Sequence, residues 1–557
     1  MSAKARAQAK LDPLAGFHPA VSEWFRSALG EPTRAQALSW PHIAEGKTAL
    51  LLAPTGSGKT LAAFLSAIDR LSRSPVPDPK KRLRVLYVSP LKALAVDVER
   101  NLRAPIAGIA AVSGRLGADL RRLEVAVRTG DTPALDRTKM LRTPPDILIT
   151  TPESLYLLLT SSQREILTSV DTVIIDEIHQ MAASKRGAHL FLSLERLEAL
   201  RKEADASLAT NATEATEATE ATRRAGVQRV GLSATQRPLD EIARLLGGAE
   251  VKGKRVLPRP VEIVDASAKK TLSITVEVPP PLAVVPFRDP RAPDIDLDAL
   301  DDGGGDTKSI WPGVHARLVE RVRAARSTMI FVNSRRLAER LATALNETAG
   351  EEIALAHHGS VAKDIRRATE ERLKAGNLPA IVATSSLELG IDMGAVDQVI
   401  QVEAPPSVAS GIQRIGRASH HVGGVPSGVL VPKHKHDLLA CAAASAGIED
   451  GDVESTFYAR NPLDVGSGAA RHRRRRSDGD RLTTTIDRSR PTSKSSGRSY
   501  VARLRSRSFR ARASTASSTC SRAATRATNS PTSARASPGT APPARSRPER
   551  ARSDSRS

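Results

Sequence analysis

Two short segments of this sequence carry residue types suited to chemistry on phosphate groups. The first, Ala53–Thr60, follows an apolar run and opens an amphipathic stretch. Gly56 and Gly58 let backbone N–H groups turn around phosphates, while Lys59 can meet the β- and γ-phosphates and the Thr60 hydroxyl can hold Mg²⁺. A glycine-rich turn that caps a helix is the plainer alternative. The Lys-Thr pair in this context favours ATP binding, although alanine replaces the first glycine of the usual motif.

The second segment is Asp176-Glu-Ile-His179, directly after the apolar run 172–175. A carboxylate at the carboxyl end of a strand, facing a phosphate loop, suits an Mg²⁺ ligand, and this role falls to Asp176. Glu177 is placed to orient and deprotonate an attacking water. Taken alone, the segment is equally typical of an acidic turn. Together with the phosphate loop it predicts ATP hydrolysis.

These residues need a scaffold, and alternating short apolar runs and amphipathic stretches predict one. Parallel strands flanked by helices are expected from this alternation, so the fold class is α/β. The apolar runs that predict strands are 49–53, 85–88, 125–127, 147–149, 173–175 and 230–232, then 329–332, 353–356, 381–383, 399–402 and 429–431.

The two series of strands predict two α/β domains, with an insertion in the first and a linker between them. We expect a first domain over 1–265, with a low-complexity Ala-Thr-Glu insertion near 205–224, and a second over 309–440. Residues 266–308 are expected to form an interdomain linker with an acidic, glycine-containing segment. Residues 441–465 are expected to start a following domain.

The formal charge of +22 is concentrated at the end of the chain. Residues 466–557 hold 23 Lys and Arg against 5 Asp and Glu, which leaves +4 for residues 1–465. Net charge therefore does not by itself predict nucleic-acid binding by the first 465 residues. Only six residues of 466–557 are large and apolar, too few for a core, so this Arg/Ser/Ala-rich tail is expected to be disordered. Two origins stay open: a basic arm, or translation out of frame.

With only Cys441 and Cys520, the sequence offers no disulfide pair and no thiolate metal site. No apolar run is long enough to span a membrane, so a cytoplasmic setting and no membrane partner are expected. The paired histidines His357-His358, His420-His421 and His434-Lys-His436 lack carboxylate or thiol ligands at metal spacing. They are expected to be exposed or packed in loops.

The ordered motifs resemble those of superfamily-two DEAD/DEAH-box helicases, and in detail those of the Lhr-type (large helicase-related) helicases, over about residues 10–465. The finer resemblance rests on Asp176–His179, Ser309–Pro312, Gln413–Ala418 and Tyr458–Asp464. It implies the N-terminal motor portion of such a helicase, with two tandem RecA-like domains, and a chain that breaks off where relatives continue into a winged helix. Many relatives end the last motif with a third arginine where this chain has His420, so Arg417 is the preferred arginine finger and Arg414 the alternative.

The resemblance assigns further residues to each role. The residues that would bind ATP are Gln36, with Phe17 upstream, Thr55, Gly56, Ser57, Gly58, Lys59, Thr60, Gly390, Asp392, Gln413, Arg414 and Arg417. The catalytic residues would be Lys59, Asp176, Glu177 and Arg417. Thr60 and Asp176 would hold Mg²⁺. Nucleic acid would contact Pro90, Lys92, Thr129, Gly130, Thr151, Pro152, Asn333, Arg335, Thr384 and Ser385, while Ser233 and Thr235 would couple hydrolysis to movement.

The implied activity is ATP-dependent 3′-to-5′ movement of a monomeric motor on single-stranded DNA, with unwinding of DNA or RNA–DNA duplexes in DNA repair. One alternative is a nucleic-acid-stimulated ATPase that remodels complexes without separating strands. Another is an inactive binding scaffold, which the intact Lys59, Asp176, Glu177 and Arg417 disfavour.

Overall fold

The computed structural model describes residues 12–54, 56–209, 226–234, 236–253, 255–267, 272–278, 310–388, 396–418, 425–460, 462 and 464–465. Several predicted features lie outside these residues: Thr55, Thr235, Gly390, Asp392, His420, His421, most of the Ala-Thr-Glu insertion, the acidic segment and the whole tail after residue 465. In the part of the chain that is described, no helix is both long and apolar enough to cross a bilayer.

Seven parallel strands form the first sheet, in the order β3-β4-β2-β5-β6-β1-β9. Their carboxyl ends share one edge, so the turns after β1, β5 and β6 meet there. Most of these strands are buried on both faces, as parallel strands between helices should be. The strands are β1 (Ala49–Leu52), β2 (Val85–Val88), β3 (Val125–Arg128), β4 (Ile147–Thr150), β5 (Thr172–Ile175), β6 (Gln228–Ser233) and β9 (Glu262–Asp265).

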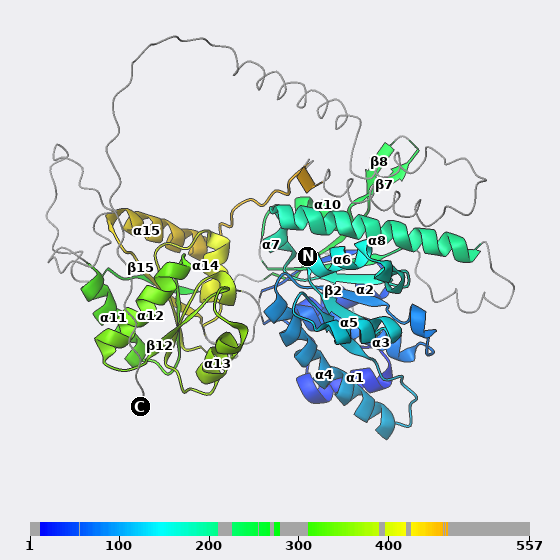
Figure 1. The fold of residues 1–557 in the computed structure, drawn as a ribbon, viewed down its shortest axis with the longest axis horizontal. Helices are drawn as coiled ribbons and strands as arrows, with labels where there is room; N and C mark the ends of the chain where they lie inside the picture. Colours follow the sequence, from blue (N-terminus) through cyan, green and yellow to red (C-terminus); the bar gives the residue numbers. More distant parts are fainter. Residues whose placement is uncertain are drawn as a thin grey trace, which may run out of the picture. The chain divides into compact units, whose positions relative to one another are not determined.

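Helices cover both faces of this sheet, and each face has its own apolar core. Figure 1 shows α6 and α8 on one side of the sheet and α1, α3 and α4 on the other. The first group comprises α6 (Pro152–Thr160), α7 (Ile178–Ala182), α8 (Lys185–Ala209) and α10 (Leu239–Gly247); the second comprises α1 (Pro19–Leu29), α2 (Arg34–Ala44), α3 (Lys59–Arg73) and α4 (Lys92–Arg115). Helix α5 (Ala134–Arg142) follows β3, and β7 (Ala249–Lys252) pairs antiparallel with β8 (Arg255–Pro258).

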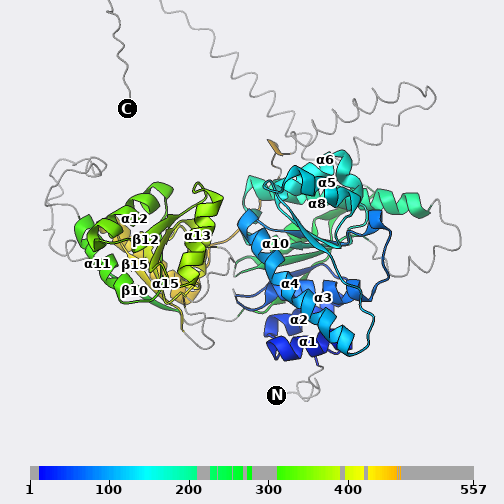
Figure 2. The same ribbon diagram turned by 60° about the horizontal axis from the view of Figure 1, so that its bottom comes forward.

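A second sheet of six parallel strands has the order β10-β15-β14-β11-β13-β12. Two apolar cores flank it, one of them beneath α11 and α12, which pack side by side (Figure 2). The strands are β10 (Ser273–Val276), β11 (Thr328–Phe331), β12 (Ala354–His357), β13 (Ala380–Ala383), β14 (Gln398–Val402) and β15 (Ser427–Val431); the helices are α11 (Trp311–Arg323), α12 (Arg335–Ala349), α13 (Lys363–Lys374), α14 (Val408–Ile415) and α15 (Lys435–Asp450). Two parallel sheets flanked by helices confirm the tandem RecA-like fold.

Two predicted boundaries are wrong. The linker predicted over 266–308 contains β10, which pairs with β15 and so belongs to the second domain. The following domain predicted from residue 441 begins inside α15, which packs against α14, β10 and β15. Local patterns missed both features, because each is defined by packing against residues distant in sequence.

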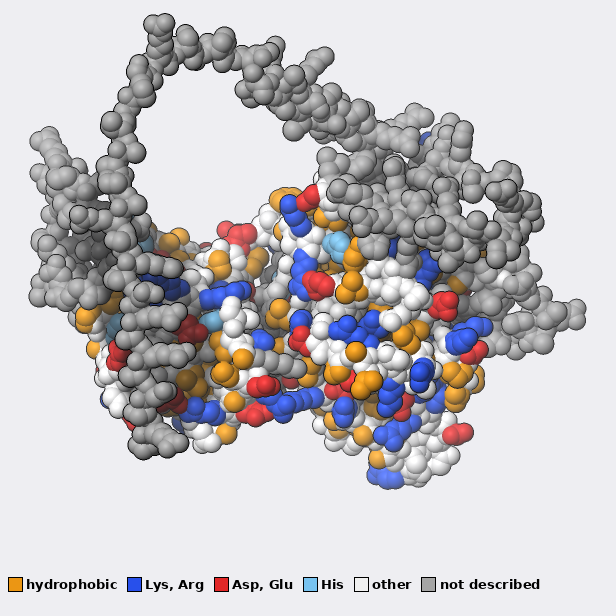
Figure 3. Space-filling model, viewed as in Figure 1, with side chains coloured by type: hydrophobic (Ala, Val, Ile, Leu, Met, Phe, Trp, Pro, Cys, Tyr) orange, Lys and Arg blue, Asp and Glu red, His pale blue; other side chains and the backbone are white. Residues whose placement is uncertain are grey.

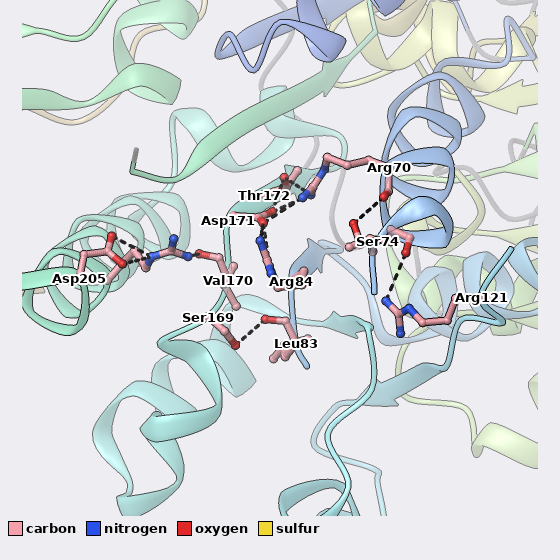
Figure 4. Close-up of polar contacts among 12 residues, drawn as sticks. Arg70, Ser74, Leu83, Arg84, Arg121, Ser169, Val170, Asp171, Thr172 and Asp205 are labelled. Carbon is pink, nitrogen blue, oxygen red and sulfur yellow. Dashed lines mark hydrogen bonds and ion pairs between the residues drawn. The ribbon is translucent and has the colours of Figure 1, made fainter. Parts of the chain in front are cut away.

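Buried ion pairs join the amino ends of the first sheet's strands, at the edge opposite the turns after β1, β5 and β6. The fully buried Asp171 carboxylate receives Arg70 Nη2 at 2.7 Å and Arg84 Nη2 at 2.7 Å (Figure 4). Burial alone would raise the pKa of Asp171, but the two guanidinium groups outweigh it and hold that pKa below its ordinary value. Asp171 and its arginines therefore fix α3, β2 and β5 to one another.

Substituting Asp171→Asn should lower the free energy of unfolding by about 3 kcal/mol, because two half-buried arginines lose their anion. The contribution of the Asp171 carboxylate to the free energy of unfolding should be complete above about pH 4, the ordinary pKa of an aspartate. It should be lost as the pH falls through the lower pKa of the folded state. Denaturant unfolding at pH 7 measures the loss. Glu351→Gln, which breaks the exposed Arg323 pair, is the control and should cost less than about 1 kcal/mol. Equal effects of the two substitutions would contradict the assignment.

Candidate active site

The phosphate loop, residues 53–60, connects β1 to α3. Gly56 and Gly58 have φ angles of 77° and 75°, a region that side chains disfavour. A Cβ at Gly58 would also lie 2.5 Å from Gln36 Nε2, so this position admits only glycine without rearrangement. Gln36 Nε2 donates to Gly58 O at 3.4 Å, and Thr33 Oγ1 donates to Ser57 O at 2.7 Å. The start of α2 therefore supports the loop, while Phe17 packs edge-on against Trp40. The predicted role of Gln36 in binding ATP stays a prediction.

The acidic pair lies at the carboxyl end of β5, on the same edge of the sheet as the phosphate loop. Asp176 and Glu177 are 3 % and 5 % exposed. Burial, together with the charge of Glu177, raises the pKa of Asp176 to about 6. The Tyr87 hydroxyl donates to Asp176 Oδ2 and orients it. Glu177 itself adopts a φ of 45°, an unusual conformation outside glycine that is often found at functional sites.

These groups fit a nucleotide and its magnesium ion. The buried Lys59 ammonium has no hydrogen-bond partner among the described residues and lies 3.5 Å from Glu177 Oε1, so it is available to a phosphate oxygen. Burial would raise the pKa of Glu177, but the charges of Lys59 and Arg417 keep it below its ordinary value. An Mg²⁺ ion suits Asp176 and the Thr60 hydroxyl, because it commonly takes one or two carboxylates together with phosphate oxygens and water.

His179 joins three motifs that are distant in sequence. Its Nδ1 lies 3.2 Å from Ser233 Oγ and 3.4 Å from Ala234 N, and its Nε2 lies 2.7 Å from Gln413 Nε2. Burial lowers the pKa of His179, so the ring is neutral at pH 7. Because Nδ1 accepts from Ala234 N, Nε2 carries the proton, and the Gln413 amide meets it best with its oxygen turned toward the ring. The ring thus links the acidic motif, the Ser233 motif and the last motif of the second domain.

The two candidate arginines have different surroundings. Arg414, 3 % exposed, bonds Gln401 Oε1 at 2.7 Å and Glu388 Oε2 at 3.0 Å. Its guanidinium is therefore held inside the second domain. Arg417 donates to Glu388 O at 2.9 Å and is among the positive charges that lower the pKa of Glu177. Because its charge acts on Glu177, the predicted base, Arg417 remains the preferred candidate for the finger over Arg414.

A cavity of about 930 Å³, here called the polar cavity, is lined by residues of both RecA-like domains. Four of the residues expected to contact nucleic acid line it: Lys92, Arg335, Thr384 and Ser385. Lys92 pairs with Asp131 at 2.5 Å, and Arg335 donates to Ser360 Oγ at 2.8 Å. Both cations are exposed, so an incoming phosphate can exchange with these partners.

The other six expected contacts do not line the polar cavity. Asn333 is engaged within the second domain, donating to Glu403 Oε2 at 3.0 Å and Ala404 O at 2.8 Å. Gly130 is exposed, and its carbonyl accepts from Arg137. The remaining four are buried: Pro90, Thr129, Thr151 and Pro152.

Sequence reasoning missed several residues that shape the site. Tyr87, on β2, reaches Asp176 on the neighbouring β5, and Glu388 and Gln401 hold Arg414. Gln236 lines the polar cavity while buried. No motif spacing indicates these contacts, because each depends on which strands pair or on how segments distant in sequence pack together.

The expectation of exposed or loop-packed histidines is wrong for His357, which is buried on β12 with its Nε2 2.9 Å from Glu370 Oε1. His358 packs in the loop after β12, with its Nε2 2.6 Å from Glu339 Oε1. Within the described residues, no group of three or more His, Cys, Asp or Glu is placed to hold a metal ion. Cys441 is a buried free thiol whose pKa burial raises to about 12.

Residues 33–242 match the DEAD/DEAH box helicase family, and residues 314–421 match the helicase conserved C-terminal domain. The chain is 49% identical over 487 residues to the Lhr helicase/probable uracil glycosylase of Mycolicibacterium smegmatis and 45% identical over 485 residues to the Lhr helicase/uracil glycosylase of Escherichia coli. The chain belongs to the Lhr-type helicases. These alignments cover 82% and 81% of this chain but 29% of each relative.

A solved structure of the Mycobacterium smegmatis Lhr helicase, bound to single-stranded DNA and AMP-PNP, superposes with a TM-score of 0.67 at 50% identity. The match covers 82% of this chain and 53% of that chain. The Lhr-type chain described here thus spans the motor domains of considerably longer relatives.

Proposed function

We propose that this Lhr-type chain is an ATP-driven motor that moves 3′-to-5′ on single-stranded DNA and separates DNA or RNA–DNA duplexes. The observation that carries the proposal is the His179 contact, which brings Gln413 of the last motif against the acidic motif beside Lys59 and Glu177. ATP binding and hydrolysis at such a two-sided site can close and release the two domains. Magnesium at Asp176 and Thr60 supplies charge stabilisation for phosphoryl transfer when bound.

Single-stranded DNA is the proposed track, since the similar mycobacterial structure holds it together with AMP-PNP. Lys92, Arg335, Thr384 and Ser385 in the polar cavity suit a phosphodiester backbone. On the face shown in Figure 3, basic and acidic side chains of the described residues are interspersed. Binding would therefore depend on positioned contacts more than on a broad basic surface. We further propose that the chain acts as a cytoplasmic monomer in DNA repair.

The decisive experiment combines two assays on the same preparation. ATP turnover should rise at least about tenfold when single-stranded DNA is added, because the strand stabilises the closed site. Strand displacement on DNA and RNA–DNA duplexes with 3′ tails should depend on ATP. Strand-stimulated turnover without displacement would favour the remodelling ATPase, and turnover that ignores added strands would contradict the motor itself.

A further inference from the structure

The N-terminus of α14 faces the polar cavity, and a carboxylate from elsewhere in the chain covers it. Glu454 Oε1 accepts from Val408 N at 2.5 Å, and its Oε2 accepts from Ala409 N at 3.3 Å. The N-cap residue Ser407 accepts from Ser410 N at 3.0 Å. The first three amides of the helix are therefore occupied, two of them by Glu454. A helix N-terminus carries partial positive charge and suits an anion such as phosphate.

Glu454 differs from the other carboxylates that line this cavity. Asp131 pairs with Lys92, Glu370 with His357 and Glu388 with Arg414. Glu454 has no basic side-chain partner within the described part of the chain and is held by backbone amides alone. The Glu454 side chain is already exposed, so little buried surface is lost when it moves into solvent.

Two buried polar side chains beside this carboxylate point to a ligand. Ser410 Oγ is buried without a hydrogen-bond partner in the residues described, although Ser410 lines the polar cavity. Gln236, 2 % exposed, also lines the cavity and leaves both amide atoms unpartnered. Unsatisfied buried polar groups of this kind are uncommon and call for a bound partner.

We propose that the α14 N-terminus, with Ser407, Ser410 and Gln236, binds a phosphodiester group of the nucleic-acid strand, and that Glu454 occupies this subsite while no strand is bound. The inference rests on the proposed function and adds a strand-binding subsite to it. The strand is the expected source of the phosphate, because Lys92 and Arg335 line the same cavity whereas Lys59 and Thr60 of the ATP site do not. When a strand enters, one of its phosphodiester groups replaces the Glu454 carboxylate on the backbone amides at the start of α14.

Helix α14 also carries Gln413 and Arg414, so this exchange takes place at the start of the helix that reaches the ATP site. The concentration of strand needed to stimulate ATP turnover should therefore follow the affinity of this subsite. Removing the competing carboxylate should lower that concentration without changing the maximal turnover.

The test compares Glu454→Gln with Asp452→Asn in the full chain. Asp452 is exposed, lies on the same segment and forms no side-chain hydrogen bond or ion pair among the described residues, so its variant matches the change in charge. Glu454→Gln should tighten binding of a labelled oligodeoxythymidylate about fivefold in low salt without nucleotide, as expected for uncovering a helix N-terminus. Asp452→Asn should change it less than about twofold, because an exposed distant charge is screened. Adding Ser410→Ala to Glu454→Gln should reverse part of the gain.

The outcomes separate the possible explanations. Equal effects of Glu454→Gln and Asp452→Asn, while the wild-type chain binds the oligonucleotide, would overturn the subsite alone. Weaker binding together with a lower melting temperature in both Glu454→Gln and Glu454→Ala would show a structural cap and also overturn it. Tighter binding of a fluorescent ATP analogue without tighter strand binding would assign the anion site to the nucleotide. If the wild-type chain binds no oligonucleotide, the result contradicts the proposed function itself and not the subsite alone.

Discussion

Replacing Arg417 with alanine is expected to slow strand-stimulated ATP turnover about 10³-fold, the usual cost of losing an arginine finger. The charge of the Arg417 guanidinium lowers the pKa of Glu177, and the same charge would stabilise the negative charge that develops on the transferred phosphoryl group. Steady-state turnover with saturating single-stranded DNA measures the loss. Binding of the strand without nucleotide should barely change, because Arg417 does not line the polar cavity.

Arg414→Ala provides the comparison. Removing Arg414 leaves Glu388 without its 3.0 Å partner inside the second domain, so this variant should also lower the melting temperature. Arg417→Ala loses a hydrogen bond to a backbone carbonyl and no ion pair with Glu388, so it should lower the melting temperature less than Arg414→Ala does. If Arg414→Ala slows turnover more than Arg417→Ala while melting normally, Arg414 is the finger.

Glu177→Gln is expected to retain ATP binding and to slow hydrolysis at least about 10²-fold, the typical contribution of a general base. The charges of Lys59 and Arg417 keep the Glu177 carboxyl ionised despite burial. An amide of the same shape can neither take the water's proton nor orient the water as strongly. Single-turnover hydrolysis separates this step from nucleotide binding. Turnover close to that of the wild type would show that another group activates the water.

Lys59→Ala is the matched control for that experiment. Its ammonium is available for phosphate oxygens, so its removal should abolish ATP binding as well as hydrolysis. A fluorescent nucleotide analogue should therefore bind the Glu177→Gln variant and fail to bind the Lys59→Ala variant. The same weak binding in both variants would mean that Glu177 acts in binding and not in the chemical step.

Local sequence predicted the two α/β domains and the residues of the first ATP motifs. Lys59 and Glu177 follow apolar strands within a few residues, and the carboxyl ends of parallel strands meet at one edge. Residues that are close in sequence determine such features, so periodicity and motif spacing can predict them. The distinction between a nearly neutral motor and a basic tail was likewise visible in the distribution of charge.

Tertiary structure decided what depends on contacts between distant residues. β10 pairs with β15, although it lies within the segment 266–308 that was predicted as a linker. Arg414 and Arg417 are three positions apart, yet Arg414 bonds the side chains of Glu388 and Gln401, whereas Arg417 bonds the Glu388 carbonyl and its charge lowers the pKa of Glu177. Glu454 reaches the N-terminus of α14 from beyond α15. Strand pairing, side-chain partners and helix capping across the fold follow from packing in three dimensions, which no local pattern in the sequence records.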